Sequence, residues 1–278
     1  MSTTASVEQW SGKDRADENF PVGSFLIRRD LRAHVHAFYA FARNADDIAD
    51  APDLHPEDKI ARLDIMQDVL LGHRDEGSPS ARALRASLAA TGVSPRHATD
   101  LLIAFRQDAT KTRYASWDEL LDYCRHSAMP VGRHVLDLHG EPPETHEPSD
   151  ALCAALQVLN HLQDCAKDLA ALDRCYLPLD MLREAGAEVA DLRAGAETPA
   201  LRAVFNALLG MVGGLNALAW DLPRRMRDRR LRVETATIVH LSHRLARRLR
   251  AGDPLATRVA LSRPDAVLSV LAALRYLP

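Results

Sequence analysis

The sequence predicts an all-α protein, and three observations support this prediction. The chain has 278 residues, of which 47% are hydrophobic but only 5% aromatic, whereas sheets are enriched in aromatic and β-branched side chains. Alanine, leucine and arginine, which favour helices, are abundant. Apolar residues recur at helical spacing along most of the chain, and no alternating strand pattern exceeds a few residues. We therefore expect a bundle of helices.

Capping signals and periodicity place the helices in order. The first begins near Arg29 and ends at Asp50. The second ends before Gly72, a residue suited to the left-handed position after a helix. Ser116 followed by Glu119 is a capping box, which opens a helix that reaches about residue 140. The expected helices span residues 29–50, 57–72, 80–91, 95–110, 116–140, 150–172, 199–228, 232–251 and 263–276, with a short helix and a turn at 178–194 and loops at 73–79 and 141–149.

The length and the connections indicate a single domain. A chain of 278 residues can bury one large core. The loops are short, and neither a linker nor an internal repeat is evident. We expect a flexible polar leader at residues 1–18 and one helical domain at residues 19–278.

Charge and cysteine content exclude several classes of protein. The net charge is −3, so the chain lacks the global basic field that holds nucleic acid. The cysteines form neither a zinc-ligand pattern nor a disulfide framework, and we expect reduced thiols in a cytoplasmic protein. They are Cys124, Cys153, Cys165 and Cys175.

Neither a signal peptide nor a membrane span is expected. Residues 1–10 lack the apolar stretch of a signal peptide. The longest apolar run, residues 200–220, is interrupted by Arg202, two asparagines and three glycines, so the protein should be soluble or peripheral. The glycines follow no strand and predict a close helix contact rather than a dinucleotide site. They are Gly210, Gly213 and Gly214.

Two helices carry aspartate pairs with the spacing of a metal site. Asp46 and Asp50 are four residues apart, and so are Asp164 and Asp168. Residues i and i+4 share a helix face, where two carboxylates repel each other by roughly 0.2–0.5 kcal/mol. Carboxylate oxygens are ligands for Mg²⁺, which also binds phosphate oxygens. A divalent cation with a phosphate-bearing substrate would explain both pairs.

The second pair belongs to a longer polar stripe. Gln157, Asn160 and the two aspartates lie within about 100° of arc on a straight helix, in a segment that is otherwise apolar. Polar residues along a buried helix are informative. A solvated face with an accidental acid pair would explain either cluster alone, whereas two clusters in one helical chain favour a metal site.

Basic residues suited to a diphosphate lie near both clusters. Arg43 precedes Asp46 by about one turn, and Arg174 follows Asp168. An arginine fork can donate two hydrogen bonds to a phosphate, although a surface charge is the default interpretation of any one of them. The further candidates are Lys111 and Arg113, with Tyr114 and Tyr176 nearby.

Three segments resemble the squalene/phytoene synthase family. Residues 39–50, YAFARNADDIAD, are similar to its first aspartate-rich motif, and residues 157–168, QVLNHLQDCAKD, are similar to its second. Residues 174–178, RCYLP, match the segment that follows the second motif. The resemblance covers roughly residues 19–275, and the ordered pair of motifs is specific to the family.

Within the family, the chain resembles the hopanoid-associated bacterial branch, the hydroxysqualene synthases. The similar segments are residues 18–22, ENFPV, and residues 123–133, YCRHSAMPVGR. Gln163 also fits this branch, whereas most of the wider family has arginine at that position. The glutamine removes a cation next to the diphosphate site, which disfavours condensation of two farnesyl diphosphates. Met129 departs from the branch pattern, which has a small polar residue there.

The resemblance implies an isoprenoid synthase fold around a central active-site cavity and a Mg²⁺-dependent reaction. The implied substrate is presqualene diphosphate, which ionises and is quenched by water to give hydroxysqualene, in squalene and hopanoid biosynthesis. Tyr39 or His134 would place the water, although core packing is the default role for His134. The implied metal ligands are Asp46, Asp50, Asn160, Asp164 and Asp168, and the implied catalytic residues are the four aspartates with Tyr39. The implied substrate-binding residues are Arg43, Asp47, Lys111, Arg113, Gln157, Asn160, Gln163, Arg174 and Tyr176.

Two alternatives remain open from the sequence. One is a head-to-head synthase that condenses two farnesyl diphosphates to presqualene diphosphate, squalene or dehydrosqualene. The other is a non-catalytic homologue that binds a lipid or a partner. The arginine run at residues 224–232 supports it, because such a run can bind an anionic membrane surface, but a solvated helix end explains the run more simply. A ferritin-like di-iron bundle is excluded because no Glu-x-x-His pair occurs.

A thirty-carbon apolar substrate is compatible with peripheral contact at the inner face of a membrane. It is also compatible with hand-over from a presqualene diphosphate synthase and to a hydroxysqualene-oxidising enzyme. No motif in the sequence indicates either association.

Overall fold

The structure, a computed structural model, describes residues 6–8 and 27–277. Over these residues the regular elements are helices, apart from an isolated bridge between Arg113 and Cys175. The all-α prediction is therefore confirmed. The helices are α1 Arg32–Asp50, α2 Pro56–Leu71, α3 Pro79–Thr91, α4 Arg96–Asp108, α5 Trp117–Ser127, α6 Met129–Leu138, η2 Pro143–Thr145, α7 His146–Leu172, α8 Leu179–Ala185, η3 Val189–Arg193, α9 Pro199–Ala219, α10 Leu222–Arg225, α11 Arg229–Ala251, α12 Arg263–Ala273 and η4 Leu274–Tyr276.

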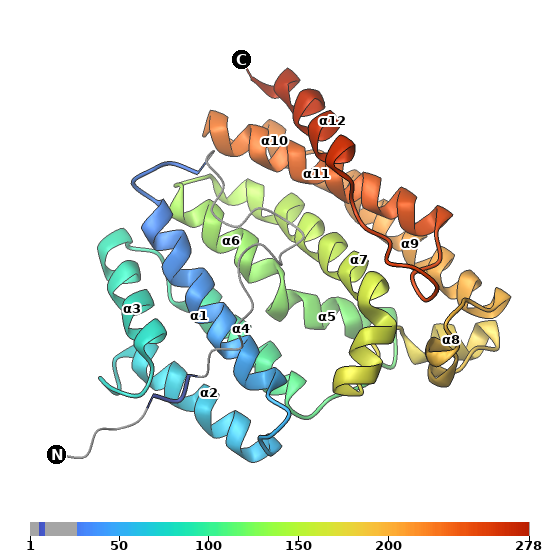
Figure 1. Cartoon of the computed structure of the whole chain (residues 1–278). Helices are drawn as coiled ribbons and strands as arrows, with labels where there is room; N and C mark the ends of the chain where they lie inside the picture. The colour runs from blue at the N-terminus through green and yellow to red at the C-terminus, as the bar shows by residue number, and fades with distance from the viewer. Residues whose placement is uncertain (1–5, 9–26, 278) are drawn as a thin grey trace. The chain divides into compact units, whose positions relative to one another are not determined.

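The chain divides into two compact units. The first comprises Met1–Thr110 and Arg133–Gly140. In it, α1 packs against α2, α3 and α4 (Figure 1). Its core is built from apolar residues that recur at helical spacing, as expected from the sequence. The fully buried members include Phe41, Ile48, Leu63, Met66, Leu84, Leu101 and Leu102.

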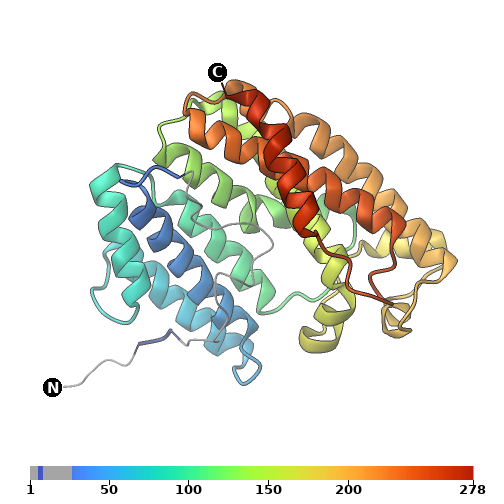
Figure 2. The same cartoon turned by 45° about the horizontal axis from the view of Figure 1, so that its top comes forward.

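The second unit comprises Lys111–Gly132 and Glu141–Pro278. Here α7 is the central helix and packs against α5, α9 and α11. Helix α12 lies along α11 on the outer side of this unit (Figure 2). Helix α6 begins in the second unit and ends in the first.

The predicted leader lies mostly outside the described residues. Residues 6–8 are described, and the backbone N–H of Val7 donates to the carbonyl of Gly77 at 2.9 Å. The carboxylate of Glu8 accepts from the backbone N–H of Ser80, also at 2.9 Å. The boundary between the leader and the domain stays a prediction. The branch segment at residues 18–22 lies outside the described residues.

Three expected elements differ from the prediction. The helix expected at 199–228 ends at Ala219, and the short helix α10 follows it. Pro223 explains the break, because a proline fits only the first turn of a helix. The helix expected at 116–140 is interrupted at Ala128 and forms α5 and α6. Pro130 explains the interruption, because a proline lacks an N–H and fits only the first turn of a helix. The loop expected at 141–149 was also wrong, since η2 and the first turn of α7 occupy it. Pro148 is accommodated there because it lies in that first turn.

The helix α6 approaches α7 closely at a glycine. A Cβ atom on Gly132 would lie 2.5 Å from Oγ of Ser149 and 2.6 Å from Sγ of Cys153. These distances are too short for a side chain, so glycine lets the two helices meet. In α9, by contrast, a Cβ atom on any of the three glycines would meet nothing within 4 Å. The close contact predicted at Gly210, Gly213 and Gly214 was therefore wrong.

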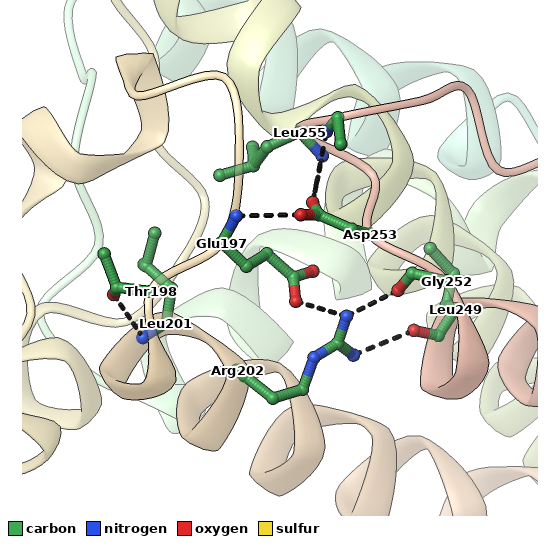
Figure 3. A network of polar contacts seen from close by, with 9 residues as sticks. Glu197, Thr198, Leu201, Arg202, Leu249, Gly252, Asp253 and Leu255 are labelled. Carbon is green, nitrogen blue, oxygen red and sulfur yellow. Dashed lines mark hydrogen bonds and ion pairs between the residues drawn. The ribbon is translucent and has the colours of Figure 1, made fainter.

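Arg202 has a structural role that the sequence did not reveal. Its guanidinium donates to the carbonyls of Leu249, at 3.0 Å, and Gly252 at the end of α11 (Figure 3). It also pairs with the carboxylate of Glu197. The backbone N–H of Glu197 donates to Asp253 at 2.9 Å. A positive charge at the end of a helix complements its dipole, so Arg202 joins the start of α9 to the end of α11.

One helical stretch of the described chain, Pro199–Arg225, is long and apolar enough to cross a membrane. Its best 18-residue window has a mean hydropathy of 1.5, and 39% of that window is buried in the structure. Leu201, Leu208 and Val212 belong to the buried face, which packs on α7 and α11. The helix therefore serves as a core helix of the second unit, and its length and composition alone are weak support for a membrane span.

Candidate active site

The first aspartate cluster lies in the last three turns of α1. The guanidinium of Arg43 binds Asp46 at 3.0 Å and Asp47 at 2.9 Å. Tyr39 lies one turn before Arg43 and is half-buried, as is Asp50. The predicted residues of α1 therefore lie at the edge of the apolar core of the first unit, partly exposed to solvent.

The charge on this part of α1 is unbalanced. Three aspartates lie near the negative end of the helix dipole, and the last turn has no basic residue. This arrangement is unfavourable unless cations compensate it. Besides Arg43, the ammonium of Lys59 donates to the carbonyl of Ala49 at 2.8 Å. Lys59 was missed from the sequence because it lies on the next helix and outside any motif.

His134 lies in the core of the first unit. Its ring stacks on Phe38 with centroids 3.8 Å apart and planes 10° apart. Its side chain is 1% exposed, and neither ring nitrogen has a hydrogen-bond partner among the described residues. Burial lowers the pKa of His134 to about 3, with a smaller effect from His97. The ring is therefore neutral near pH 7, and these contacts favour the packing role.

The second cluster lies along α7 in the second unit. Asn160, Asp164 and Asp168 recur every fourth residue and are half-buried. The residues between them, including Leu159 and Leu162, are buried. The helix thus presents a line of oxygen donors at the edge of an apolar core, as the sequence predicts.

A short segment brings the predicted basic residues next to the end of α7. The backbone N–H of Cys175 donates to the carbonyl of Thr112 at 2.9 Å, and that of Leu179 donates to Tyr114 at 2.9 Å. The segment that holds Lys111 and Arg113 therefore runs beside the segment that holds Arg174 and Tyr176. Sequence alone did not predict this pairing, because the two segments are about 60 residues apart.

The basic residues of this region differ in their partners. Lys111 pairs with Glu119 and lies 4.7 Å above the ring of Tyr114. Arg113 binds Asp173 at 2.8 Å, and this hydrogen bond lowers the pKa of Asp173. A diphosphate would compete with these carboxylates for both cations. Arg174 is buried, and a buried guanidinium is a stronger donor than an exposed one.

An aromatic cluster adjoins the basic residues. Tyr114 and Tyr176 were candidates from the sequence, whereas the role of His161 in this cluster was missed. Tyr176 stacks on His161 with ring centroids 3.5 Å apart and on Tyr114 at 5.4 Å. Tyr123 lies 5.6 Å from Tyr176. Nε2 of His161 contacts the amide nitrogen of Gln157 at 3.1 Å. The sequence contained one indication of this role for His161. It lies four residues after Gln157, so it shares the helix face of the polar stripe.

The side chain of Gln163 forms a hydrogen bond to the backbone of a distant segment. Its amide nitrogen donates to the carbonyl of Val259 at 2.6 Å. Val259 lies in the segment that connects α11 to α12. The neutral side chain therefore ties α7 to this connection and adds no positive charge to the stripe.

Neither cluster forms a complete metal site by itself. No group of three His, Cys, Asp or Glu side chains able to hold a metal occurs within residues 6–8 and 27–277. Each cluster offers two aspartates at i and i+4, whose hard oxygens suit Mg²⁺ when phosphate oxygens complete the coordination. The donor chemistry thus fits a cation that is shared with a diphosphate.

Comparison with known proteins identifies relatives over nearly the whole chain. The squalene/phytoene synthase family profile matches residues 13–265. The chain is 46% identical over 271 residues to a hydroxysqualene synthase of Rhodopseudomonas palustris, with 98% of this chain and 92% of that protein covered. It is 46% identical over 246 residues to a hydroxysqualene synthase of Sinorhizobium fredii, with 88% and 84% covered.

A solved structure supports the same relationship. The crystal structure of squalene synthase HpnC from Alicyclobacillus acidocaldarius matches with a TM-score of 0.75 at 32% identity. The match covers 85% of this chain and 90% of that one. Because it includes residues of both units, it confirms the prediction of a single all-α domain.

Proposed function

Because the chain belongs to the squalene/phytoene synthase family, we propose that it is a hydroxysqualene synthase. It converts presqualene diphosphate and water to hydroxysqualene and diphosphate. The observation that carries this proposal is the near-full-length similarity to hydroxysqualene synthases. The two aspartate clusters, both present with their spacing intact, support an active enzyme over a non-catalytic homologue.

Mg²⁺ is the proposed cofactor. The donors of both clusters are oxygens, and the excess negative charge at the end of α1 calls for a cation. A bound Mg²⁺ would act as a Lewis acid toward the leaving diphosphate. The residues that would hold it are Asp46, Asp50, Asn160, Asp164 and Asp168.

The side chains of the protein bind and orient the diphosphate. Arg43 holds Asp46 and Asp47 in place through its two ion pairs, which keeps the first cluster organised before substrate binds. Arg174 is the proposed donor to diphosphate oxygens. Lys111 and Arg113 can add to it by exchanging their present carboxylate partners.

The proposed reaction breaks the bond between carbon and the diphosphate oxygen, and the electron pair leaves with diphosphate. The cation rearranges, water adds through its oxygen, and one proton is released. Apolar surroundings protect the cation from other water molecules. Tyr39, half-buried on the same face of α1 as Arg43, is the proposed residue that orients the reacting water.

Squalene synthesis is the second candidate. The name of the matched structure, a squalene synthase, favours it at 32% identity. Against it, Gln163 adds no cation next to the second cluster and bonds to backbone instead. Head-to-head condensation needs ionisation of a first farnesyl diphosphate, which a cation at this position would assist.

The proposed lipid substrate implies that two other enzymes act before and after this one. An enzyme that makes presqualene diphosphate must supply the substrate, and an enzyme that oxidises hydroxysqualene would consume the product. We propose a cytoplasmic location with hand-over between these enzymes, which co-purification of the three proteins would test.

Isotope labelling tests the proposed reaction. Purified protein with Mg²⁺ is given presqualene diphosphate or farnesyl diphosphate in water enriched in oxygen-18, and the lipids are identified by mass spectrometry. We expect labelled hydroxysqualene from the first substrate and no product from the second. Squalene or presqualene diphosphate from farnesyl diphosphate would contradict the proposal and favour the second candidate. An unlabelled alcohol would exclude water as the quenching group.

A further inference from the structure

Helix α12 is packed with its apolar face outward. Its buried positions are Asp265, Ser269 and Ala273. Val267 is 57% exposed and Leu271 is 58% exposed. Burial of such side chains normally stabilises a protein, so this arrangement is the reverse of the usual one. The exposed large apolar residues of this segment are Val267, Leu268, Val270, Leu271, Leu274 and Leu277.

The outward orientation is fixed by polar contacts on the inner side. Asp265 binds Arg248 at 2.6 Å and Arg244 at 3.4 Å, both on α11. Ser262 and Asp265 also form a capping box at the start of α12. These contacts prevent rotation of the helix about its axis. The exposed residues from Val267 to Leu274 then form one stripe, about 160° wide at 100° per residue.

Arginines flank this stripe in the sequence. Asp265 points inward, and residues 266–277 contain no aspartate or glutamate. Arg263 lies at one end of α12, and Arg275 lies at the other. The guanidinium of Arg275 lies 5.6 Å from the ring of Trp220 and 5.2 Å from that of Tyr276.

The contact with Trp220 places the arginine run beside the far end of α12. Residues 222–232 begin two positions after Trp220 and contain six arginines and one acid, Asp228. Asp228 caps α11 by accepting from the backbone N–H groups of Arg230 and Leu231. Most of the arginines are exposed at this positive end of the helix dipole. The solvated helix end expected from the sequence is present. Arg224 and Arg225 pair with Asp221, at 3.7 Å and 3.1 Å, and Arg225 also lies 3.8 Å from Glu147. The excess positive charge of the run therefore lies mainly at Arg227, Arg229 and Arg230, which are exposed.

We propose that α12 docks the enzyme onto an anionic lipid surface. The stripe inserts among the headgroups and acyl chains, while the flanking arginines bind lipid phosphates. A stripe of aliphatic residues with arginines and aromatic rings at its borders has the chemistry of an interfacial helix. A second copy of the chain fits less well, because a symmetric pairing of this face brings Arg263 and Arg275 of the two copies together.

Docking would place the enzyme where its substrate and product reside. Both are thirty-carbon lipids if the proposed function holds, and the docking itself does not depend on that function. Membrane binding and turnover are therefore measured separately.

Vesicle flotation of the full-length protein tests the proposal. The vesicles contain phosphatidylcholine alone or phosphatidylcholine with phosphatidylglycerol. The variants are Val267→Gln with Leu271→Gln, and Arg229→Gln with Arg230→Gln. The matched control is Ile103→Gln, a comparably exposed apolar residue on α4 of the other unit, 46% exposed.

We expect the wild type and the control to float with the anionic vesicles and to bind neutral vesicles weakly. The α12 variant should lose binding about tenfold or more, and each arginine removed should cost roughly fivefold at low salt. Unchanged flotation of the α12 variant, or no flotation of the wild type, would overturn the proposal. So would a wild-type dimer that the α12 variant converts to monomer in light scattering, because a second copy would then cover the face.

Turnover of presqualene diphosphate in detergent separates the two proposals. The α12 variant should keep wild-type turnover there, since its substitutions lie on an exposed face outside both aspartate clusters. An enzyme that floats but makes no hydroxysqualene would contradict the proposed function and leave the docking proposal standing.

Discussion

Arg43 shows how one residue organises the first aspartate cluster. It bridges Asp46 and Asp47 from one turn earlier on the same helix. The pair with Asp46 is partly solvent-exposed and contributes little to stability. The pair with Asp47 is largely buried, so the cost of removing both charges from water offsets much of their attraction. Their effect is on geometry, because they hold two carboxylates that would otherwise repel each other.

Substitution of single aspartates tests the metal site. We expect Asp46→Asn and Asp164→Asn each to lower kcat for presqualene diphosphate about 10²–10³-fold, as when one stabilising group is removed from a charged transition state. Steady-state assays with added Mg²⁺ measure the effect. Asp53→Asn is the control, since this exposed residue lies just beyond α1, and it should retain activity. Wild-type turnover in either cluster variant would remove the basis for the metal site.

At the scale of elements, glycines on two helices have opposite roles. Gly132 lets α6 approach α7, whereas Gly213 on α9 faces open space. Glycine in a helix interior costs roughly 0.5–1 kcal/mol relative to alanine because it loses more backbone entropy on folding. At Gly132 this cost is offset by the close packing of two helices. At Gly213 nothing in the described structure offsets it.

The two glycines provide a matched pair of substitutions. We expect Gly132→Ala to destabilise the protein by about 1–2 kcal/mol, because the new methyl group would clash with Ser149 and Cys153. Gly213→Ala should stabilise it by about 0.5–1 kcal/mol. Urea unfolding measures both. A Gly132→Ala variant as stable as the wild type, or more stable, would refute the close approach of α6 to α7.

For the whole molecule, buried histidines determine part of the response to acid. His134 in the first unit and His161 in the second are both neutral in the folded chain, because burial lowers the pKa of each to about 3. In the unfolded chain a histidine has a pKa of about 6.5. Between these values the unfolded state binds more protons, so stability falls as the pH falls from about 6.5 toward 3.

His134→Leu tests this dependence. The substitution removes one of the two histidines whose pKa is lowered to about 3, together with its two ring nitrogens, which lack a hydrogen-bond partner in the described part of the chain. The free energy of unfolding should then drop between pH 7 and pH 5 by about 2 kcal/mol less than in the wild type. Urea unfolding at both pH values measures the difference. His55→Leu, at an exposed position, is the control and should change nothing. An equal acid response in wild type and His134→Leu would show that His134 is accessible to protons.

Much of the site was predictable because its signals are local. The spacing of Asp46 and Asp50, and of Asp164 and Asp168, follows from the helical repeat. The predicted roles of these residues stay predictions that the substitutions above test. The aromatic cluster of Tyr123, Tyr176 and His161 was not predictable, because its members come from separate segments that meet only in the folded chain.

The sequence by itself determined the helical class, most helix boundaries and the two aspartate-rich motifs. Periodicity, caps and motif spacing depend on neighbours within a few residues, so they can be deduced before the chain folds. Gly72 is an example, since it ends α2 in the left-handed conformation as predicted. Family membership followed from the same local segments.

Only the tertiary structure decided which side of a helix meets another element. It showed that Gly132, rather than the glycines of α9, is the close contact, and that Gln163 bonds to the backbone of Val259. It also turned Asp265 inward and left Leu271 exposed. The physical reason is that packing and ion pairing join residues far apart in the chain, and helical periodicity contains no information about which partner a face will meet.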